Sequence, residues 1–193
     1  MIYLDYAAHC PVEKEVLDVY YQASLKYFAN PNAMHTLGLQ AQEKIDQTTK
    51  EIAKKLNVLP EEIIYTSGAS EANNLAIKGT LERYKHRGKH ILISALEHNS
   101  ILSSATKMQE YGFEVEIIPI NKDGRVDLER LVSLIRKDTI LVSVCGVDSE
   151  LGIRQPIEEI AAILKNYPYC FFHCDASQAI GKVSIDFSNV DLV

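Results

Sequence analysis

The residues His90-Ile-Leu-Ile-Ser-Ala-Leu-Glu-His-Asn-Ser100 join a short apolar run to a polar turn. The run His90–Ser94 has the length of a strand, and its largely apolar character is typical of a strand that is buried on both faces. The chain contains four further runs of this kind, which are Ile63–Thr66, Val115–Ile118, Ile140–Val144 and Cys170–Cys174. Together the five runs predict the strands of a buried, parallel sheet.

Amphipathic segments alternate with these runs. Apolar residues recur at helical spacing within residues 45–56, 128–135 and 157–164. Pro60 and Pro156 are each followed by two glutamates, which is typical of the first turn of a helix. The pattern predicts an α/β fold, a doubly wound, mostly parallel sheet with helices on both faces and right-handed crossovers. Since ligands of such folds bind at the carboxyl ends of strands, functional side chains are expected directly after them.

The chain of 193 residues suits one domain, and no internal repeat, low-complexity segment or linker divides it. We therefore expect a single partial domain over residues 1–193. The last residues, Val190-Asp-Leu-Val193, are apolar and strand-like. No helix or polar tail follows them, so the sheet is expected to be incomplete at this end and further sequence to follow.

The composition is that of a globular protein with neither a membrane nor a nucleic-acid role. Hydrophobic residues make up 47% of the chain and charged residues 24%, and the formal net charge is -6. Nucleic-acid-binding proteins usually carry a basic patch instead. No apolar run approaches the roughly 18 residues of a transmembrane helix, and the N-terminus lacks a signal-peptide pattern. We expect a cytoplasmic protein.

The four cysteines are irregularly spaced and form no C-x-x-C pair, so reduced thiols are expected. Two of them, Cys170 and Cys174, flank His173 and raise the alternative of a metal cluster. In an extended strand His173 and Cys174 face opposite sides, and the run is strongly apolar. Buried strand residues are therefore favoured over metal ligands, and no metal site is predicted.

A turn rich in small residues, Ser67-Gly-Ala-Ser-Glu71, lies between the run Ile63–Thr66 and a helical stretch that begins near Ala72. Backbone N–H groups at such a turn can approach an anion, and the helix dipole favours negative charge there. The turn is thus a plausible phosphate cradle. Small residues also make ordinary helix caps, so Ser70 could cap the helix or donate its hydroxyl to a phosphate.

Two further polar residues follow apolar runs, as the fold class predicts for functional side chains. His98 follows the first run and could stack on an aromatic cofactor, although a histidine at a helix start can also be hydrogen-bonded locally. Asp175 follows the last run, with Gln178 three residues further on. Asp175 could be a simple helix cap, or it could hold its carboxylate against a pyridinium nitrogen.

Taken together, the ordered motifs resemble the aminotransferase class V family, and within it most closely the cysteine desulfurases. No single motif is specific, but their order and spacing match over nearly the whole chain. The matching segments are Tyr3-Leu-Asp-Tyr-Ala-Ala8, Asn30-Pro-Asn-Ala-Met-His35, Thr66–Gly79, Glu97-His98, Asp123-Gly-Arg-Val-Asp127, Glu150-Leu-Gly152 and Asp175–Lys182.

The resemblance implies the large domain of a fold-type-I enzyme that uses pyridoxal 5'-phosphate. In the family's pattern His98 matches the histidine that stacks on the cofactor ring and takes part in proton transfer. Asp175 matches the aspartate that pairs with the ring nitrogen, and Gln178 the residue that bonds the phenolic oxygen. Ala69 and Ser70 match the phosphate-binding pair. The implied reaction removes sulfur from L-cysteine and gives L-alanine, in a homodimer that serves a sulfur-acceptor protein.

The sequence departs from the family pattern around the substrate. Ser149 stands where an asparagine normally contacts cofactor and substrate, and its shorter side chain weakens that contact. Tyr6, His9 and Cys10 replace residues that are usual in the N-terminal segment. Substrate identity is therefore less firmly implied than the cofactor, and a selenocysteine lyase or an aminotransferase is the alternative within the family.

The family's Schiff-base lysine lies in a Ser-x-His-Lys segment that these residues do not contain. The cysteine that accepts sulfur as a persulfide and the small C-terminal domain are expected beyond Val193 as well. Lys78 and Lys182 are expected to be solvated surface residues, and Cys145 a core strand residue. We expect the chain as it stands to be catalytically inactive. The alternative from a different class is a non-catalytic module that binds a partner or free cofactor.

Overall fold

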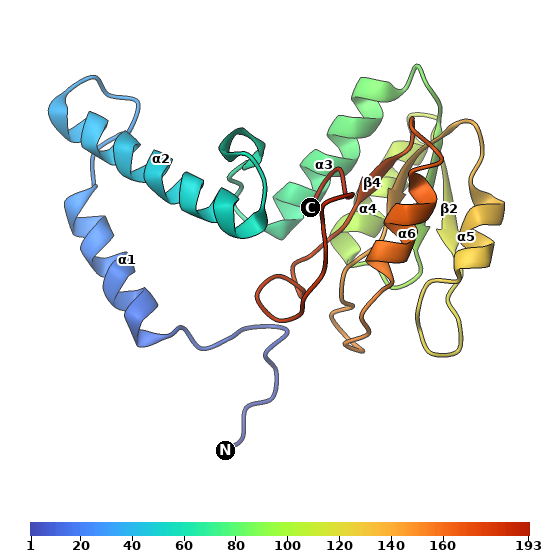
Figure 1. Cartoon of the computed structure of the whole chain (residues 1–193), viewed down its shortest axis with the longest axis horizontal. Coiled ribbons are helices and arrows are strands. Elements are labelled where there is room, and N and C mark those ends of the chain that lie inside the picture. Colours follow the sequence, from blue (N-terminus) through green and yellow to red (C-terminus); the bar gives the residue numbers. More distant parts are fainter. The chain divides into compact units, whose positions relative to one another are not determined.

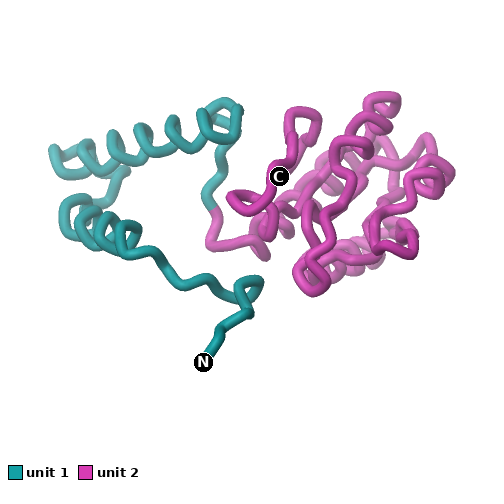
Figure 2. The backbone as a smooth tube through the Cα atoms, turned by 60° about the horizontal axis from the view of Figure 1, so that its bottom comes forward, with its two compact units in different colours: residues 1–65 teal, residues 66–193 magenta.

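The computed structural model describes all residues 1–193 and divides into two compact units, residues 1–65 and residues 66–193 (Figure 2). The first unit contains helix α1 (Lys14–Lys26), helix α2 (Thr36–Leu56) and the short 3-10 helix η1 (Pro60–Glu62) (Figure 1). The predicted helix over residues 45–56 is the second half of α2, and α1 was not predicted. The assignment of the whole chain to one partial domain stays a prediction.

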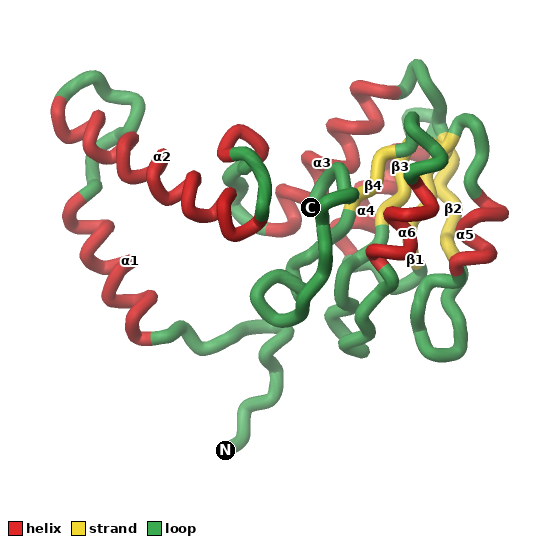
Figure 3. The backbone as a smooth tube through the Cα atoms, viewed as in Figure 1, coloured by secondary structure: helices red, strands yellow, loops and turns green.

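The second unit is a layered α/β structure (Figure 3). Its strands pair in the order β2-β1-β3-β4, and every pair is parallel. Strands and helices alternate along the chain, which confirms the predicted fold class. In chain order the elements are α3 (Ala69–Tyr84), β1 (His90–Ser94), α4 (Asn99–Gln109), β2 (Glu114–Ile118), α5 (Leu128–Leu134), β3 (Thr139–Ser143), α6 (Ile157–Leu164) and β4 (Phe171–His173).

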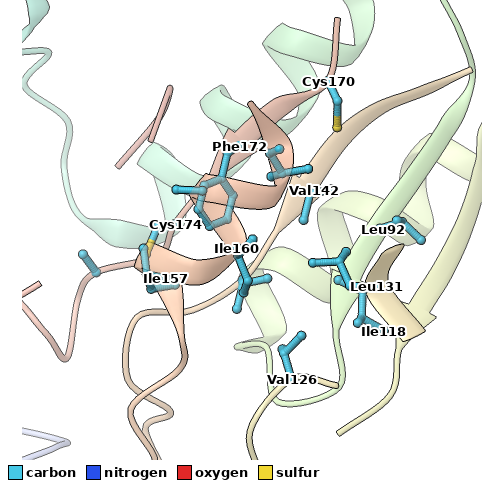
Figure 4. Close-up of a cluster of buried hydrophobic side chains, with 14 of the residues drawn as sticks. Leu92, Ile118, Val126, Leu131, Val142, Ile157, Ile160, Cys170, Phe172 and Cys174 are labelled. Atoms are coloured by element: carbon cyan, nitrogen blue, oxygen red, sulfur yellow. The ribbon is translucent and has the colours of Figure 1, made fainter. Parts of the chain in front are cut away.

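The two faces of the sheet carry separate hydrophobic cores, because successive strand residues point to opposite faces. In β1, Leu92 belongs to one core and its neighbours Ile91 and Ile93 to the other. The core around Leu92 is formed with α5 and α6, and Figure 4 shows its side chains converging. The second core is formed with α3 and α4. Helices therefore cover both faces, as the near-continuous apolar runs predicted.

The predicted strand over Ile63–Thr66 is wrong. These residues follow η1 in an extended loop, and no strand of the sheet pairs with them. Ile64 and Tyr65 are 70% and 60% exposed. A short apolar run forms a strand only if a neighbouring strand is available for backbone hydrogen bonding. Sequence periodicity does not show whether such a strand is present. The small-residue turn therefore follows a loop and not a strand.

Three other predicted strands differ from the observed ones by one residue at one or both ends, and the predicted strand Val115–Ile118 is observed as Glu114–Ile118. The predicted strand Ile140–Val144 is observed as Thr139–Ser143, and Cys170–Cys174 as Phe171–His173.

The strand-like segment at the end of the chain lies along the outer edge of β4. Leu192 forms a parallel bridge with His173, and its carbonyl accepts a hydrogen bond from the Cys174 N–H at 2.8 Å.

The cysteine and histidine residues of the last run lie in the core, as predicted. Cys170 and Cys174 are buried, and His173 is 2% exposed. The His173 ring lies 2.9 Å from the Ser143 hydroxyl, and burial lowers the pKa of His173 to about 4. His173 is therefore a neutral core residue.

No helix of the structure combines the length and the apolar character that crossing a bilayer requires.

Candidate functional site

The polar residues singled out in the sequence gather at the carboxyl ends of three neighbouring strands. β1 and β3 are adjacent, yet β1 continues into α4 on one face and β3 into α6 on the other. This reversal is the topological switch point at which open α/β sheets bind ligands. His98 follows β1, Ser149 follows β3 and Asp175 follows β4.

Asp175 is a buried carboxylate that is stabilised by hydrogen-bond donors. It is 9% exposed, and its Oδ1 accepts hydrogen bonds from the Ser177 N–H at 2.9 Å and the Ser177 hydroxyl at 2.6 Å. Its Oδ2 accepts from the Asn73 amide at 2.8 Å. Burial acts to raise the pKa of Asp175, but these hydrogen bonds outweigh it and hold the pKa below its ordinary value. The carboxylate is therefore ionised at neutral pH without pairing to a lysine or arginine.

Asn73 and Ser100 connect Asp175 to His98. The amide nitrogen of Asn73, on α3, also donates to the Ser100 hydroxyl oxygen at 2.9 Å. Ser100 lies in the first turn of α4, and its hydroxyl oxygen is 2.9 Å from Nδ1 of His98. Two bridging residues thus join the aspartate and the histidine, which come from segments 77 positions apart in the sequence. This supports the expectation that they share a site.

His98 is the N-cap residue of α4, which confirms the alternative that this histidine is hydrogen-bonded locally at a helix start. Its Nδ1 accepts a hydrogen bond from the Ser100 N–H at 3.1 Å, which satisfies one of the unpaired donors of the helix start. The residue as a whole is exposed. Capping therefore fixes the ring by one edge and leaves the remainder accessible. A role toward a cofactor stays a prediction.

The neighbour of His98, Glu97, is a buried acid to which the sequence reasoning gave no role. It is 8% exposed, and its Oε1 accepts from the Ser94 hydroxyl at 2.6 Å and from the Cys145 N–H at 2.8 Å. Its Oε2 is buried without a hydrogen-bond partner. Burial raises the pKa of Glu97 to about 7, with smaller contributions from Asp175 and Asp148. Glu97 ties the end of β1 to the segment that follows β3.

The predicted phosphate turn forms the start of α3, which begins at Ala69. Glu71 closes the turn by accepting hydrogen bonds from the N–H and the hydroxyl of Ser67, at 2.6 and 2.7 Å. The N–H groups of the first helical turn have no acceptor within an α-helix, so those of Ala69 and Ser70 are available to an anion. Asn73 lies on the same helix, one turn beyond Ala69.

Gln178 lies close to this network in sequence, and Ser149 is not hydrogen-bonded to it. Gln178 follows Asp175 by three residues, and its Oε1 accepts a hydrogen bond from Lys182 at 2.6 Å. Ser149 is exposed in the loop after β3 and hydrogen-bonds to none of the residues above. Its neighbour Asp148 is buried and accepts from the Leu151 N–H. Roles for Gln178 and Ser149 at a cofactor stay predictions.

The two candidate lysines are hydrogen-bonded, and two buried cysteines are protonated. Lys78 donates to the Asn74 side chain and Lys182 to Gln178, each on its own segment. Cys145 is buried as predicted, although it lies two residues beyond β3 and not within it. Burial raises the pKa of the Cys145 and Cys174 thiols far above neutrality, so neither is a thiolate at physiological pH.

A family model and curated relatives match essentially the whole chain. The model of aminotransferase class V matches residues 2–192. A mitochondrial cysteine desulfurase of Candida maltosa is 42% identical over 195 residues, which cover 100% of this chain and 40% of that protein. Cysteine desulfurase IscS 1 of Archaeoglobus fulgidus is 40% identical, over 98% of this chain and 49% of that protein.

Solved structures agree in fold and extent. A NifS-like protein superposes with a TM-score of 0.94 at 33% identity and covers 98% of this chain and 53% of its own. SspA, solved in complex with cysteine, gives a TM-score of 0.91 at 35% identity, over 98% of this chain and 55% of its own. The chain spans about half the length of the proteins it matches. It belongs to the aminotransferase class V family.

Proposed function

We propose that residues 1–193 form the cofactor-binding part of a cysteine desulfurase that uses pyridoxal 5'-phosphate. The proposed reaction converts L-cysteine to L-alanine and passes the sulfur through an enzyme persulfide to an acceptor protein, for iron-sulfur cluster or thio-cofactor synthesis. The observation that carries the proposal is the ionised Asp175 carboxylate. It is buried at the carboxyl end of β4, unpaired with any lysine or arginine, and linked through two residues to His98.

The residues present fit this cofactor. A pyridinium N–H needs a carboxylate that stays ionised in a partly desolvated place, and the donors on Asp175 provide that condition. The phosphate would be held by the first-turn N–H groups at Ala69 and Ser70 and by the Ser70 hydroxyl, where the dipole of α3 favours negative charge. When bound, the cofactor supplies an electron sink for a substrate carbanion.

His98 is proposed to stack on the cofactor ring and to move a proton at its Nε2 atom, because its Nδ1 atom is occupied by the Ser100 N–H. Gln178 is proposed to bond the phenolic oxygen. Ser149 is proposed to take the place of the family's asparagine with a shorter reach. These three assignments rest on the family pattern together with positions after β1, β3 and β4.

The proposed activity is tested with the product of the complete gene, by measuring alanine formed from L-cysteine. The account predicts alanine from cysteine, with the sulfur released as sulfide only when a thiol reductant is added to reduce the persulfide, and a loss of turnover in His98→Ala. A preference for selenocysteine, or transfer of the amino group to a keto acid without release of sulfur, would instead assign the protein to another activity of the same family.

We propose further that the Schiff-base lysine and the sulfur-accepting cysteine lie outside these residues. Lys182 is exposed, whereas Lys78 is half-buried and not the solvated surface residue expected from the sequence; both are hydrogen-bonded to a side chain of their own segment, and neither is enclosed as a nucleophilic lysine at neutral pH usually is. Borohydride treatment of the 193-residue chain with pyridoxal phosphate should leave no specifically modified peptide. Stoichiometric reduction onto a single lysine, found by peptide mass spectrometry, would contradict this part of the proposal.

We also propose that the protein is a homodimer located in the cytoplasm. Helix α1 has no buried residue, and several of its large apolar side chains are more than half exposed, namely Val16, Val19, Tyr20, Tyr21 and Leu25. A 13-residue helix is marginal in water unless its apolar face packs against something. Light scattering over a concentration series tests self-association, and a constant mass of 21.7 kDa would contradict it.

A further inference from the structure

The hydrogen bonds between Asp175 and His98 run in one determined direction. The Asp175 carboxylate accepts hydrogen bonds and, when ionised, cannot donate one. The side-chain amide of Asn73 must therefore present its nitrogen to Asp175, since the opposite orientation would bring two oxygens together. That nitrogen carries two hydrogens, and the second is directed to the Ser100 hydroxyl oxygen at 2.9 Å. Both donors of Asn73 are thus used.

The direction continues to the histidine. Because the Ser100 oxygen accepts from Asn73, its single hydrogen is free for the neighbour at 2.9 Å, which is Nδ1 of His98. The backbone N–H of Ser100 also points at Nδ1, and a backbone N–H can only donate. Two donors therefore converge on Nδ1, and the neutral ring must carry its hydrogen on Nε2.

We infer that Asn73 and Ser100 are positioning residues in one chain of hydrogen bonds, in which Ser100 sets the tautomer of His98 and Asn73 orients the Ser100 hydroxyl while it donates to the Asp175 carboxylate. Asn73 is 4% exposed and has no carboxyl or imidazole group, so it holds the two groups in register and does not relay a proton between them. The functional meaning rests on the proposed function, in which Asp175 and His98, at the two ends of this series of hydrogen bonds, contact the cofactor. The hydrogen-bond pattern itself does not depend on a cofactor.

The test is NMR of the cofactor-free 193-residue chain with 15N-labelled histidine rings and 13C-labelled aspartate carboxyls. Signals of His98 and Asp175 are assigned by their loss in His98→Gln and Asp175→Asn. In alkaline buffer, where imidazoles are neutral, Nε2 of His98 should give the pyrrole-like signal and Nδ1 a pyridine-like signal shifted by hydrogen bonding. A predominant hydrogen on Nδ1 would overturn the inference.

Three variants separate positioning from a structural effect. Asn73→Leu should shift the Nδ1 signal toward that of a free ring and raise the titration midpoint of Asp175. Ser100→Ala should shift Nδ1 without moving Asp175, and Ser100→Thr should restore it. Asn74→Leu is the matched control, because the Asn74 amide donates to the Ser70 carbonyl on its own helix, and it should move neither signal.

If Asn73→Leu moves only one of the two signals, the chain of hydrogen bonds does not exist as described. If Asn73→Leu fails to fold, the Ser100 pair still decides the histidine part. Because these measurements contain no pyridoxal phosphate, their failure is distinct from that of the proposed function. If the protein shows this hydrogen-bond pattern but does not bind pyridoxal phosphate, the inference stands and the proposed function is wrong.

Discussion

The acidic side chains at the two ends of the parallel sheet differ in their hydrogen-bond partners. At the amino ends of the strands, the Arg136 guanidinium donates to both carboxylate oxygens of Glu114, at 3.0 and 2.7 Å, and to Asp138 at 3.1 Å. Nearby, the His90 Nε2 atom lies 3.3 Å from a Glu116 oxygen. Here Glu114 and Asp138 pair with Arg136 at the surface, whereas His90 is buried and burial lowers its pKa.

At the carboxyl ends the acids have no basic partners. Glu97 and Asp175 are 8% and 9% exposed, and their hydrogen-bond donors are neutral hydroxyl, amide and backbone groups. The pKa of Glu97 is raised to about 7, whereas that of Asp175 is lowered. At the amino end Glu114 and Asp138 already have a cationic partner in Arg136, while the carboxyl end holds a negative charge that a cationic ligand group can complete.

The largest effect is expected from removing that charge. Asp175→Asn should weaken the binding of pyridoxal phosphate by about 30-fold or more, because losing one partner of a desolvated charge pair costs about 2 kcal/mol or more. Fluorescence titration of the cofactor measures the change. Asp138→Asn is the matched control at the amino end and should leave binding unaltered. Equal affinities for pyridoxal phosphate in the parent, Asp175→Asn and Asp138→Asn would show that Asp175 does not contact the cofactor.

A pH-dependent effect is expected from Glu97. Its folded-state pKa of about 7 lies above the ordinary value of 4.5, so the native state retains a proton that the unfolded state has released. The stability contributed by the neutral carboxyl is fully present below pH 4.5 and is lost as the pH rises through 7. The total loss is about 3 kcal/mol, from about 1.4 kcal/mol per pKa unit.

Glu97→Gln removes this dependence, because glutamine keeps an acceptor oxygen but does not ionise. Denaturant unfolding at a series of pH values should show the variant gaining stability relative to the parent as the pH rises from 4.5 to above 7. Glu114→Gln is the control, since Arg136 lowers the pKa of Glu114. Parallel stability curves for the parent and Glu97→Gln would show that Glu97 is ionised throughout.

The smallest effect is expected at the amino end. Arg136→Met breaks exposed ion pairs with Glu114 and Asp138, and such pairs contribute little because water and salt screen them. The melting temperature should fall by at most about 4 °C. The difference should disappear at high salt. A larger, salt-independent loss would mean that the two ends of the sheet do not differ as described.

Much of the second unit could be predicted from sequence periodicity. His90–Ser94 is a strand with the predicted bounds, and residues 157–164 form the predicted helix, because each buries a regular pattern of side chains. Ile63–Thr66 was mispredicted, since the same apolar pattern occurs without a pairing strand. α1 was missed although Val16, Leu17, Tyr20 and Tyr21 recur at helical spacing, and none of its residues is buried.

The site was only partly predictable. His98 and Asp175 follow apolar runs, so the fold class alone points to them. Asn73 and Ser100 lie inside helices that carry no such signal, and their importance depends on contacts between residues 102 and 27 positions apart. Glu97 was missed for a related reason. Its burial is set by the end of β3, which the local sequence around β1 does not contain.

The central claim is that the carboxyl ends of β1 and β4 bind pyridoxal phosphate through Asp175, His98 and the start of α3. The most direct test is to titrate the cofactor into the 15N-labelled chain and follow each backbone amide by NMR. The account predicts saturable shifts at Ala69, Ser70, His98, Ser100 and Ser177, with the amides around Arg136 unchanged. Shifts centred on any other part of the sheet, or no saturable shifts at these five amides, would contradict it.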